Sequence, residues 1–438
     1  MRLNDRAWDR VALAGIVVGA AARAAWVFWL HPPLDYLYSD MGLYVRFASE
    51  IARGHDLDVY ATFQPQGTHL LLALPLKLLG SGRSGLWGGA ALWWAFSAAT
   101  PFFAWRLARL LLTPAAGAVT AILAAIWPLH VTLAGYFLSE TPSLAFLLAA
   151  LWLGYRAGRQ PGRGALWQGV LAGTLGAVAV AARPQFLLNL TLVAVPFLPR
   201  RRWSPTAVLP FVAAAAALLV AAVAFNTAAA GRLTGLSREG GATFFIGQCR
   251  VKTLTVHTAT VSATIGAPPY VQRGGAAVDV AGHELWEDGF FYRKGLRCIE
   301  RDGAHYPVHA ARMIGDMTAT SKPWPQVNEP TLSGVVDGAN KVYGYGLLPL
   351  IVVVSLVRIA RRVPTAAGET ALLAHLACVI PVAVVFLGDP RFRTPYDVFG
   401  LALAAAAITA KPRQSGAFPR GRAPRSPGSS EKAGEQAL

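Results

Sequence analysis

Charged residues are scarce in this sequence and make up 14% of its 438 residues. Acids are the scarcer of the two signs, with 23 Asp and Glu against 40 Lys and Arg, which gives a formal net charge of +17. The chain has three cysteines, no internal repeat, and no Walker, Rossmann or zinc-finger motif. The sequence therefore gives no support for a nucleotide site.

Apolar residues are abundant instead. Hydrophobic side chains account for 54% of the chain, and the mean hydropathy of +0.42 lies outside the range usual for soluble proteins. In a soluble protein, the excess of basic residues would suggest nucleic acid as a partner. Here the basic residues sit in short clusters between apolar segments, as in the cytoplasmic loops of membrane proteins. We therefore predict an all-α polytopic membrane protein that contacts the lipid bilayer and no nucleic acid.

Ten apolar segments satisfy the positive-inside rule when one alternating path connects them. This path places the main arginine clusters and both termini on the cytoplasmic side. The first segment lacks a small-residue cleavage site, so we expect it to remain as a helix rather than to be removed as a signal peptide. The predicted transmembrane helices cover residues 11–30, 86–107, 115–133, 141–153, 165–182, 186–198, 208–225, 343–356, 370–387 and 395–408.

The predicted path divides the chain into four parts. They are an N-terminal transmembrane module (1–227) with its first outer loop at 31–84, an extracytoplasmic region (228–341), the last transmembrane helices (342–410) and a disordered cytoplasmic tail (411–438). Segment 67–80 of the outer loop is apolar but too short to cross the bilayer, and we expect it to lie along the outer interface. Cys249 and Cys298 both fall in the extracytoplasmic region, where a disulfide between them is allowed but not required.

Two acids, Asp40 and Glu140, reach the outer face on this path. Asp40 directly precedes the helical pattern 44–52, and Glu140 lies at the outer start of the fourth predicted helix. Taken singly, each acid is explained equally well as a helix cap, because an N-terminal carboxylate is favoured by the helix dipole. Taken together, two acids at one face of a membrane protein indicate a functional site, since ionisable groups there are costly.

Three arginines, Arg183, Arg391 and Arg393, also fall on the outer face, against the positive-inside rule. A phosphate that enters through the bilayer would explain them, because a guanidinium group binds phosphate with two parallel hydrogen bonds. The alternative is a salt bridge, and Asp389 is the obvious partner for either Arg391 or Arg393.

Four short blocks of the sequence carry a family resemblance. They are residues 38–44 with 48–54, residues 63–67 leading to 79–80, residues 138–141, and residues 388–395. In order and placement they resemble the integral membrane glycosyltransferases of the GT-C fold, close to the protein O-mannosyltransferase and aminoarabinose-transferase group. The resemblance implies an inner (plasma) membrane enzyme that transfers a sugar from a polyprenyl-phosphate donor to a glycan, lipid or protein acceptor on the extracytoplasmic face, usually with inversion.

The resemblance also implies roles for individual residues. Asp40 matches the first-loop catalytic residue, which would deprotonate the acceptor hydroxyl. Glu140 matches the second acidic position, which would orient the acceptor or hold a divalent metal such as Mg²⁺ or Mn²⁺. Arg391 and Arg393, with Arg183, would bind the departing lipid phosphate. The supporting or acceptor-binding candidates are His130, Tyr44 and His69.

The sequence departs from the family pattern in two places. Gln66 and His69 stand where many relatives have proline and an aromatic residue, and Glu140 replaces a frequent Asp, so the identity of the sugar does not carry over. The rival hypotheses are a non-catalytic transporter or flippase of a lipid-linked glycan and a structural subunit. Transporters usually place ionisable groups near the membrane midplane, whereas these acids gather at one face. The enzyme hypothesis requires Asp40 and Glu140 to meet in one cavity with Arg391 or Arg393.

Overall fold

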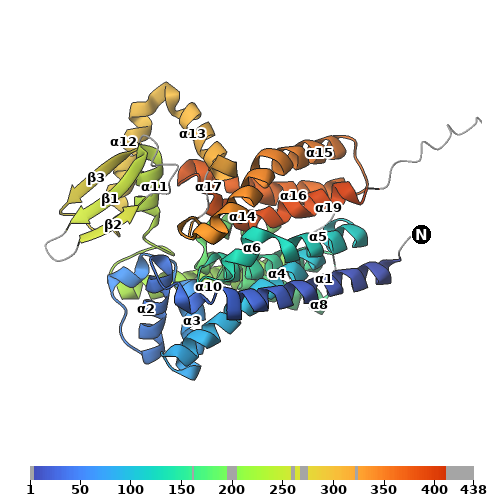
Figure 1. The fold of residues 1–438 in the computed structure, drawn as a ribbon, viewed down its shortest axis with the longest axis horizontal. Coiled ribbons are helices and arrows are strands. Elements are labelled where there is room, and N and C mark those ends of the chain that lie inside the picture. Colours follow the sequence, from blue (N-terminus) through green and yellow to red (C-terminus); the bar gives the residue numbers. More distant parts are fainter. Residues whose placement is uncertain are drawn as a thin grey trace, which may run out of the picture.

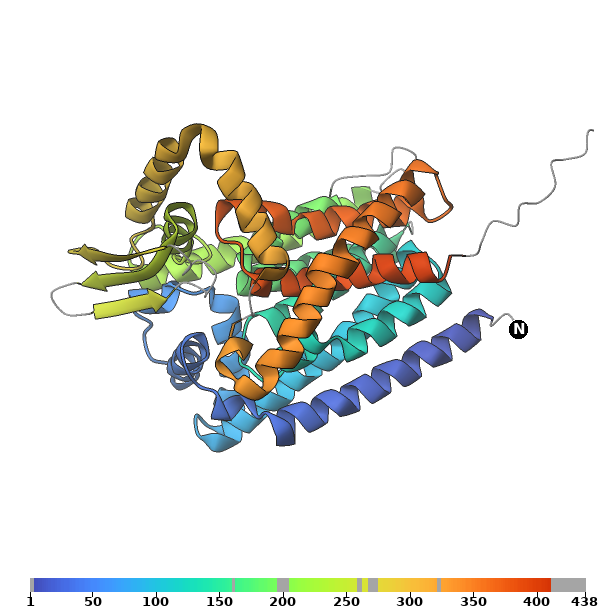
Figure 2. The same ribbon diagram turned by 45° about the horizontal axis from the view of Figure 1, so that its top comes forward.

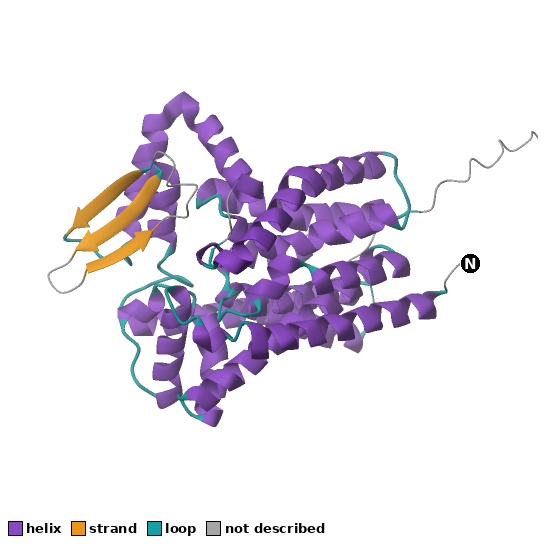
Figure 3. Ribbon diagram, in the orientation of Figure 1, coloured by secondary structure: helices purple, strands orange, loops and turns teal. Residues whose placement is uncertain are grey.

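The computed structural model describes residues 4–159, 162–194, 205–257, 262–266, 275–320 and 324–410. The long helices lie side by side along the long axis of the molecule, and a small sheet stands at one end (Figure 1, Figure 3). The start of the first helix and the end of the last described helix lie at the opposite end (Figure 1). The predicted tail at 411–438 lies outside the described residues.

The helical bundle contains most of the predicted apolar segments. Its members are α1 (Asp5–Ala25), α4 (Arg83–Leu111), α5 (Pro114–Ile126), α6 (Pro128–Leu133), α7 (Glu140–Ala157), α8 (Arg163–Ala182), α9 (Leu187–Ala194), α10 (Pro205–Ala230), α15 (Leu348–Ala360), α16 (Ala366–Ala377), α17 (Val379–Val385) and α19 (Asp397–Ile408). Figure 2 shows α14 (Pro330–Lys341) and α15 as one run, joined by the π-helical turn Val342–Leu347.

Each of the ten predicted segments contains helix in its described residues. Within the described chain, five spans are long and apolar enough to cross a membrane, namely Asp5–Asp35, Arg163–Ala182, Thr206–Ala230, Thr331–Ala360 and Ala366–Val385. The chain is therefore a multi-pass membrane protein. The other predicted segments are shorter or less apolar; the third, for example, is divided at Pro128 into α5 and α6. The count of ten crossings stays a prediction.

Small residues let neighbouring helices of the bundle approach closely. At Gly169 of α8, an added Cβ would lie 2.4 Å from the carbonyl oxygen of Ala207 in α10, and at Gly173 it would lie 2.2 Å from that of Phe211. These two glycines are four residues apart and so lie on one face of α8. This is the packing that small residues at i and i+4 give between membrane helices.

The predicted first outer loop (31–84) contains an amphipathic helix, α2 (Asp40–Arg53), and an apolar helix, α3 (Gln66–Leu79). The segment predicted to be an interfacial helix therefore forms a helix, beginning after Pro65 and ending at Gly80, whose φ is +89°. Its placement along the membrane interface stays a prediction. Buried side chains of α2 and α3 pack with residues of α4 and of the segment before α7.

The all-α prediction is wrong for the region predicted to be extracytoplasmic (228–341), because residues 251–281 contain a sheet. Its strands are β1 (Val251–His257), β2 (Ser262–Gly266) and β3 (Ala276–Ala281), in the order β2-β1-β3, with β1 antiparallel to β2 and parallel to β3. The β-branched residues of β1 favour a strand. Its buried residues share a core with α11 (Gly240–Cys249) and α12 (Asp288–Asp302). A disulfide between Cys249 and Cys298 joins these two helices.

Candidate active site

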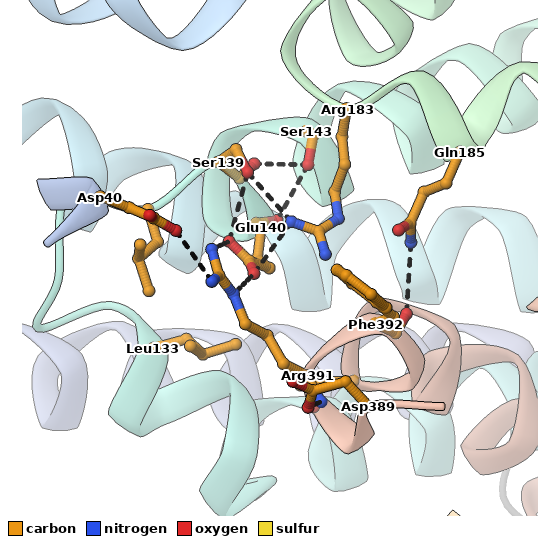
Figure 4. Close-up of polar contacts among 12 residues, drawn as sticks. Asp40, Leu133, Ser139, Glu140, Ser143, Arg183, Gln185, Asp389, Arg391 and Phe392 are labelled. Atoms are coloured by element: carbon orange, nitrogen blue, oxygen red, sulfur yellow. Dashed lines mark hydrogen bonds and ion pairs between the residues drawn. The ribbon is translucent and has the colours of Figure 1, made fainter. Parts of the chain in front are cut away.

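Asp40 and Glu140 meet at one side chain, that of Arg391. Arg391 Nη1 donates to Asp40 Oδ2 at 3.0 Å, while Nε and Nη2 of the same guanidinium donate to the two oxygens of Glu140. Figure 4 shows the three side chains pointing toward one another from separate elements. The structure thus brings together residues that are separated by 100 and 251 positions in the sequence. Asp40 and Arg391 line one cavity, whereas Glu140 lies behind Arg391 and does not line it.

Both acids occupy the first position of a helix. Asp40 begins α2 and Glu140 begins α7, whereas the N-cap positions belong to Ser39 and Ser139, whose side chains make no capping bond. The alternative that the two acids are N-caps is therefore wrong. The first helical turn still favours their negative charge, and their carboxylates are free to point toward Arg391.

Arg391 belongs to the short helix α18 (Pro390–Arg393), which follows α17. The Asp389 side chain caps this helix by accepting from the Arg391 backbone N–H at 2.7 Å. The guanidinium also stacks over the ring of Trp324, 4.5 Å from its centroid. Burial alone would lower the pKa of Arg391, but Glu140 and Asp40 hold it well above its usual value. Arg391 is therefore a permanent cation between two acids, and its predicted contact with phosphate stays a prediction.

Glu140 is fully enclosed, with 1% of its surface exposed. Arg183 Nη1 lies 2.9 Å from Oε1, which also accepts from Arg391, and Ser139 Oγ donates to Oε2 at 3.3 Å. Two guanidinium groups on one carboxylate would repel a cation, so a divalent metal at Glu140 does not fit this arrangement. In the part of the chain that the structure describes, no group of three or more His, Cys, Asp or Glu side chains could hold a metal ion.

Arg183 lies where α8 ends, directly before the 3-10 turn Pro184–Phe186. It is 6% exposed. Its Nη1 donates to Ser139 Oγ at 3.0 Å and pairs with Glu140. Its Nε and Nη2 are buried and have no hydrogen-bond partner among the described residues. These two N–H groups form one edge of the guanidinium plane, the same edge that Arg391 uses on Glu140.

A cavity of about 160 Å³ adjoins this cluster. Its polar wall includes Asp40, Tyr44, Arg183, Glu239 and Arg391. Its apolar wall is supplied mainly by the start of η4 (Pro184–Phe186), by α17 and its C-terminal end, and by α18. The apolar lining residues are Pro65, Ala182, Pro184, Val382, Phe386 and Phe392. The cavity can therefore hold a ligand with both an anionic and an apolar part.

Glu239, a third acid at the cavity, was missed from the sequence. It stands directly before α11, in Ser237-Arg238-Glu239-Gly240, and nothing in this polar stretch distinguishes it from an ordinary loop. Burial and the neighbouring Asp40 raise the pKa of Glu239 to about 7, against the opposing effect of Arg391 and Arg183. A carboxyl group with such a pKa in a cavity is a candidate functional group.

Arg393 does not line the cavity, so its position gives no support to its predicted role in phosphate binding. The side chain is fully buried and donates to Asp397 Oδ1 at 2.8 Å, to Asn340 Oδ1 at 2.7 Å and to the carbonyl oxygen of Thr318. The salt-bridge alternative holds for Arg393, although its partner is Asp397 rather than Asp389. Its role is to fix the start of α19 against α14.

Substituting Arg393 by Met should destabilise the protein without weakening donor binding. It leaves the buried carboxylate of Asp397 unpaired, which typically costs about 3–5 kcal/mol. The double variant Arg393→Met with Asp397→Leu removes both charges and should recover a large part of the loss in thermal unfolding. Equal destabilisation by the single and double variants would contradict the ion-pair interpretation.

The remaining supporting candidates separate into two groups. Tyr44 lines the cavity and is 3% exposed. His69 is completely buried under α2, with Nδ1 2.9 Å from Gln66 Oε1 and its ring 5.3 Å from that of Tyr44. His130 faces a separate small pocket behind Glu140, and its Nε2 lies 2.9 Å from the Thr394 carbonyl oxygen. Neither histidine lines the main cavity, so both can act on it through neighbours alone.

Comparisons with known proteins agree with the resemblance noted in the sequence. Residues 64–225 match the family model described as dolichyl-phosphate-mannose-protein mannosyltransferase. The matched range contains the block around Gln66 and the block with Glu140, whereas the blocks with Asp40 and Arg391 lie outside it. The predicted resemblance to these membrane glycosyltransferases is confirmed over the matched range. No curated protein matches the chain in sequence.

Solved structures give similarities over most of this chain. The oligosaccharyltransferase AglB of Archaeoglobus fulgidus, in complex with an inhibitory peptide and a dolichol-phosphate, is 15% identical over 91% of this chain and 50% of its own, with a TM-score of 0.46. The complex of the same enzyme with Zn and sulfate is 14% identical over 90% of this chain and 49% of its own, with a TM-score of 0.49. ArnT from Cupriavidus metallidurans, in the apo state, is 16% identical over 90% of this chain and 77% of its own, with a TM-score of 0.40. The chain spans about half the length of the oligosaccharyltransferase.

Proposed function

We propose that the chain is a membrane glycosyltransferase that moves a sugar from a polyprenyl-phosphate donor to a hydroxyl-bearing acceptor. The unpaired Nε–Nη2 edge of Arg183, a residue of the cavity wall, supports this proposal most strongly, because a buried donor without a partner is costly. A phosphate ester is the matching ligand, since its oxygens accept two parallel hydrogen bonds from one guanidinium edge. The apolar wall nearby suits the first part of the lipid chain.

Asp40 is proposed as the base of the reaction. One of its oxygens accepts from Arg391, and with 27% of its side chain exposed it remains accessible from the cavity. Asp40 takes the proton of the acceptor hydroxyl as the acceptor oxygen attacks the anomeric carbon of the sugar. A carbon–oxygen bond to the acceptor forms, the bond to the phosphate oxygen breaks, and polyprenyl phosphate leaves with the electron pair. Attack opposite the leaving group inverts the anomeric configuration.

Glu140 and Arg391 act as positioning residues in this proposal. Glu140 holds both guanidinium groups, which places Arg183 at the phosphate and Arg391 at Asp40. Preorganised charges of this kind stabilise the negative charge that grows on a leaving phosphate without needing to reorient during the reaction. The metal role that the resemblance gave to Glu140 is replaced here by two arginines.

We place the protein in the inner (plasma) membrane, with its cavity on the extracytoplasmic side and both termini in the cytoplasm. The support is that α1 begins, and α19 ends, at the end of the bundle opposite the sheet (Figure 1). Arginines Arg106 and Arg109 stand at the C-terminal end of α4, and Arg109 pairs there with Asp9 near the start of α1. A basic end is the cytoplasmic end in most membrane proteins.

Arg183→Ala should raise the KM for a polyprenyl-phosphate mannose donor. The substitution removes two charge-assisted hydrogen bonds worth about 1.5–3 kcal/mol each, so the expected increase is about 10²- to 10⁴-fold. Arg183→Lys keeps the charge but not the two-pronged edge, and should fall between Ala and wild type. The measurement is the dependence of initial transfer rate on donor concentration in lipid nanodiscs.

Arg53→Ala is the matched control, because Arg53 is 51% exposed at the end of α2 and does not line the cavity. It should leave the donor KM unchanged. A wild-type donor KM in Arg183→Ala, with the protein folded, would contradict the assignment of Arg183 to the phosphate.

A further inference from the structure

Glu239 is held rigidly in the cavity wall by its neighbours. The backbone N–H of Arg238 donates to the carbonyl oxygens of Thr62 and Phe63, at 3.0 and 3.1 Å. On the other side, the backbone N–H of Gly241 donates to Asp288 Oδ1 at 2.8 Å, and a Cβ at Gly241 would lie 2.6 Å from the Asp288 backbone. Such fixed flanks position a side chain more exactly than a free loop does.

The carboxyl group of Glu239 has no hydrogen bond or ion pair with any described residue, although it lines the cavity. The charged groups around it come from four different elements. Asp40 of α2 and Glu140 of α7 repel its charge, while Arg183 at the end of α8 and Arg391 of α18 attract it. Neither arginine is within ion-pair distance of Glu239, because each is already engaged by Glu140.

Two residues of one cavity wall therefore carry hydrogen-bonding atoms that have no partner among the described residues. Arg183 offers two N–H donors and is more than nine-tenths buried, and Glu239 offers two acceptor oxygens. The phosphate of the donor satisfies Arg183 but offers Glu239 no hydrogen-bond donor, which leaves the hydroxyls of the donor sugar and of the acceptor. The acceptor hydroxyl that faces Asp40 is one such donor, and it is used in the reaction. Glu239 is thus matched by a further hydroxyl. Asp40, which lines the same cavity and whose charge acts most strongly on Glu239, places the acceptor beside it.

We propose that Glu239 binds the acceptor, by accepting a hydrogen bond from a second hydroxyl next to the one that Asp40 deprotonates. The proposal rests on the proposed sugar transfer and gives the acceptor a chemical class, namely a sugar-bearing molecule with neighbouring hydroxyls. Carboxylates bind hydroxyl pairs of sugars well, because each oxygen accepts a separate O–H. Glu239 acts on acceptor affinity, whereas Asp40 acts on the chemical step.

Glu239→Gln tests this role with two acceptors that share one alkyl chain, octyl mannoside and octan-1-ol. The variant should raise the KM for octyl mannoside about 10-fold, since a charge-assisted bond becomes a neutral one. It should leave the KM for octan-1-ol and for the mannosyl donor unchanged. Glu239→Asp, which keeps the charge, should recover part of the affinity. The matched control is Glu300→Gln on the exposed surface of α12.

The pH dependence of the KM for octyl mannoside is a further test, because a purely structural role of Glu239 would not alter it. Because the pKa of Glu239 is raised to about 7, its carboxylate form becomes populated as the pH rises through neutrality. The wild-type KM for octyl mannoside should therefore decrease as the pH is raised from about 6 to about 8, a window of about one unit on each side of that pKa. The KM of Glu239→Gln should not change over this window.

The outcomes separate the two proposals. If the wild type releases no sugar to either acceptor or to water, the proposed function fails. If the wild type transfers sugar while Glu239→Gln keeps the wild-type KM for octyl mannoside and its pH dependence, the role of Glu239 fails alone. Equal weakening of octyl mannoside and octan-1-ol by the variant would also overturn it.

Discussion

Asp40→Asn is expected to lower the kcat of sugar transfer by about 10²- to 10⁴-fold, which is the usual contribution of a positioned general base. Asn has nearly the same shape as Asp but takes up no proton at neutral pH. The contact between residue 40 and Arg391 retains an oxygen acceptor, so the variant should fold. The donor KM should change little, because Arg183 is untouched. The measurement is the initial rate of mannose transfer at saturating donor.

Asp35→Asn is the matched control for this prediction. Asp35 lies in the same predicted outer loop, at the end of the 3-10 turn Pro33–Asp35, where it is exposed and outside the cavity. It should retain the wild-type rate. Full transfer by Asp40→Asn would remove Asp40 from the chemistry and leave Glu239 as the acid to test next.

Glu140→Ala is expected to lower both stability and transfer. Removing this carboxylate leaves two buried guanidinium groups without their shared partner, and breaking a buried ion pair typically costs about 3–5 kcal/mol. Arg183 and Arg391 would also lose the contact that positions them, so transfer should fall together with the unfolding temperature. The measurements are thermal unfolding in nanodiscs and the initial rate of transfer by the folded fraction.

Glu140→Asp separates charge from shape in the same pair of measurements. It keeps the negative charge but shortens the side chain by one methylene, so stability should exceed that of Glu140→Ala while transfer stays impaired. A Glu140→Ala protein with wild-type stability and rate would contradict the view that Glu140 organises the two arginines.

The sequence was most informative where a local pattern decides the structure. Apolar segments predicted helices, because every backbone group in lipid needs an internal partner. The expectation that Asp40 and Glu140 lie on the outer face came from the alternation of these helices and stays a prediction. The small sheet was missed because β1 is only seven residues long and lies in a polar region. Its pairing with β3 joins two strands that are not adjacent in the sequence, and a local pattern does not reveal such a contact.

The arginines show where sequence reasoning stops. Arg391 and Arg393 are two positions apart in one helical turn, so their side chains leave α18 in nearly opposite directions, about 200° apart. One reaches Asp40 and Glu140, and the other reaches Asp397. The sequence alone does not indicate which of the two arginines contacts Asp40 and Glu140. Glu239 was equally hidden, since its proximity to Asp40 arises from a contact between elements 199 positions apart.

The most direct measurement of the account is a transfer assay with a polyprenyl phosphate that carries radiolabelled mannose. The purified protein is reconstituted in vesicles with octyl mannoside, and both the released polyprenyl phosphate and the labelled product are quantified for the wild type and Asp40→Asn. We expect the wild type to release one carrier for each mannose transferred, with the anomeric configuration inverted, and Asp40→Asn to release almost none. If the labelled donor crosses the bilayer intact and no mannose leaves its carrier, the protein is a transporter and the account is contradicted.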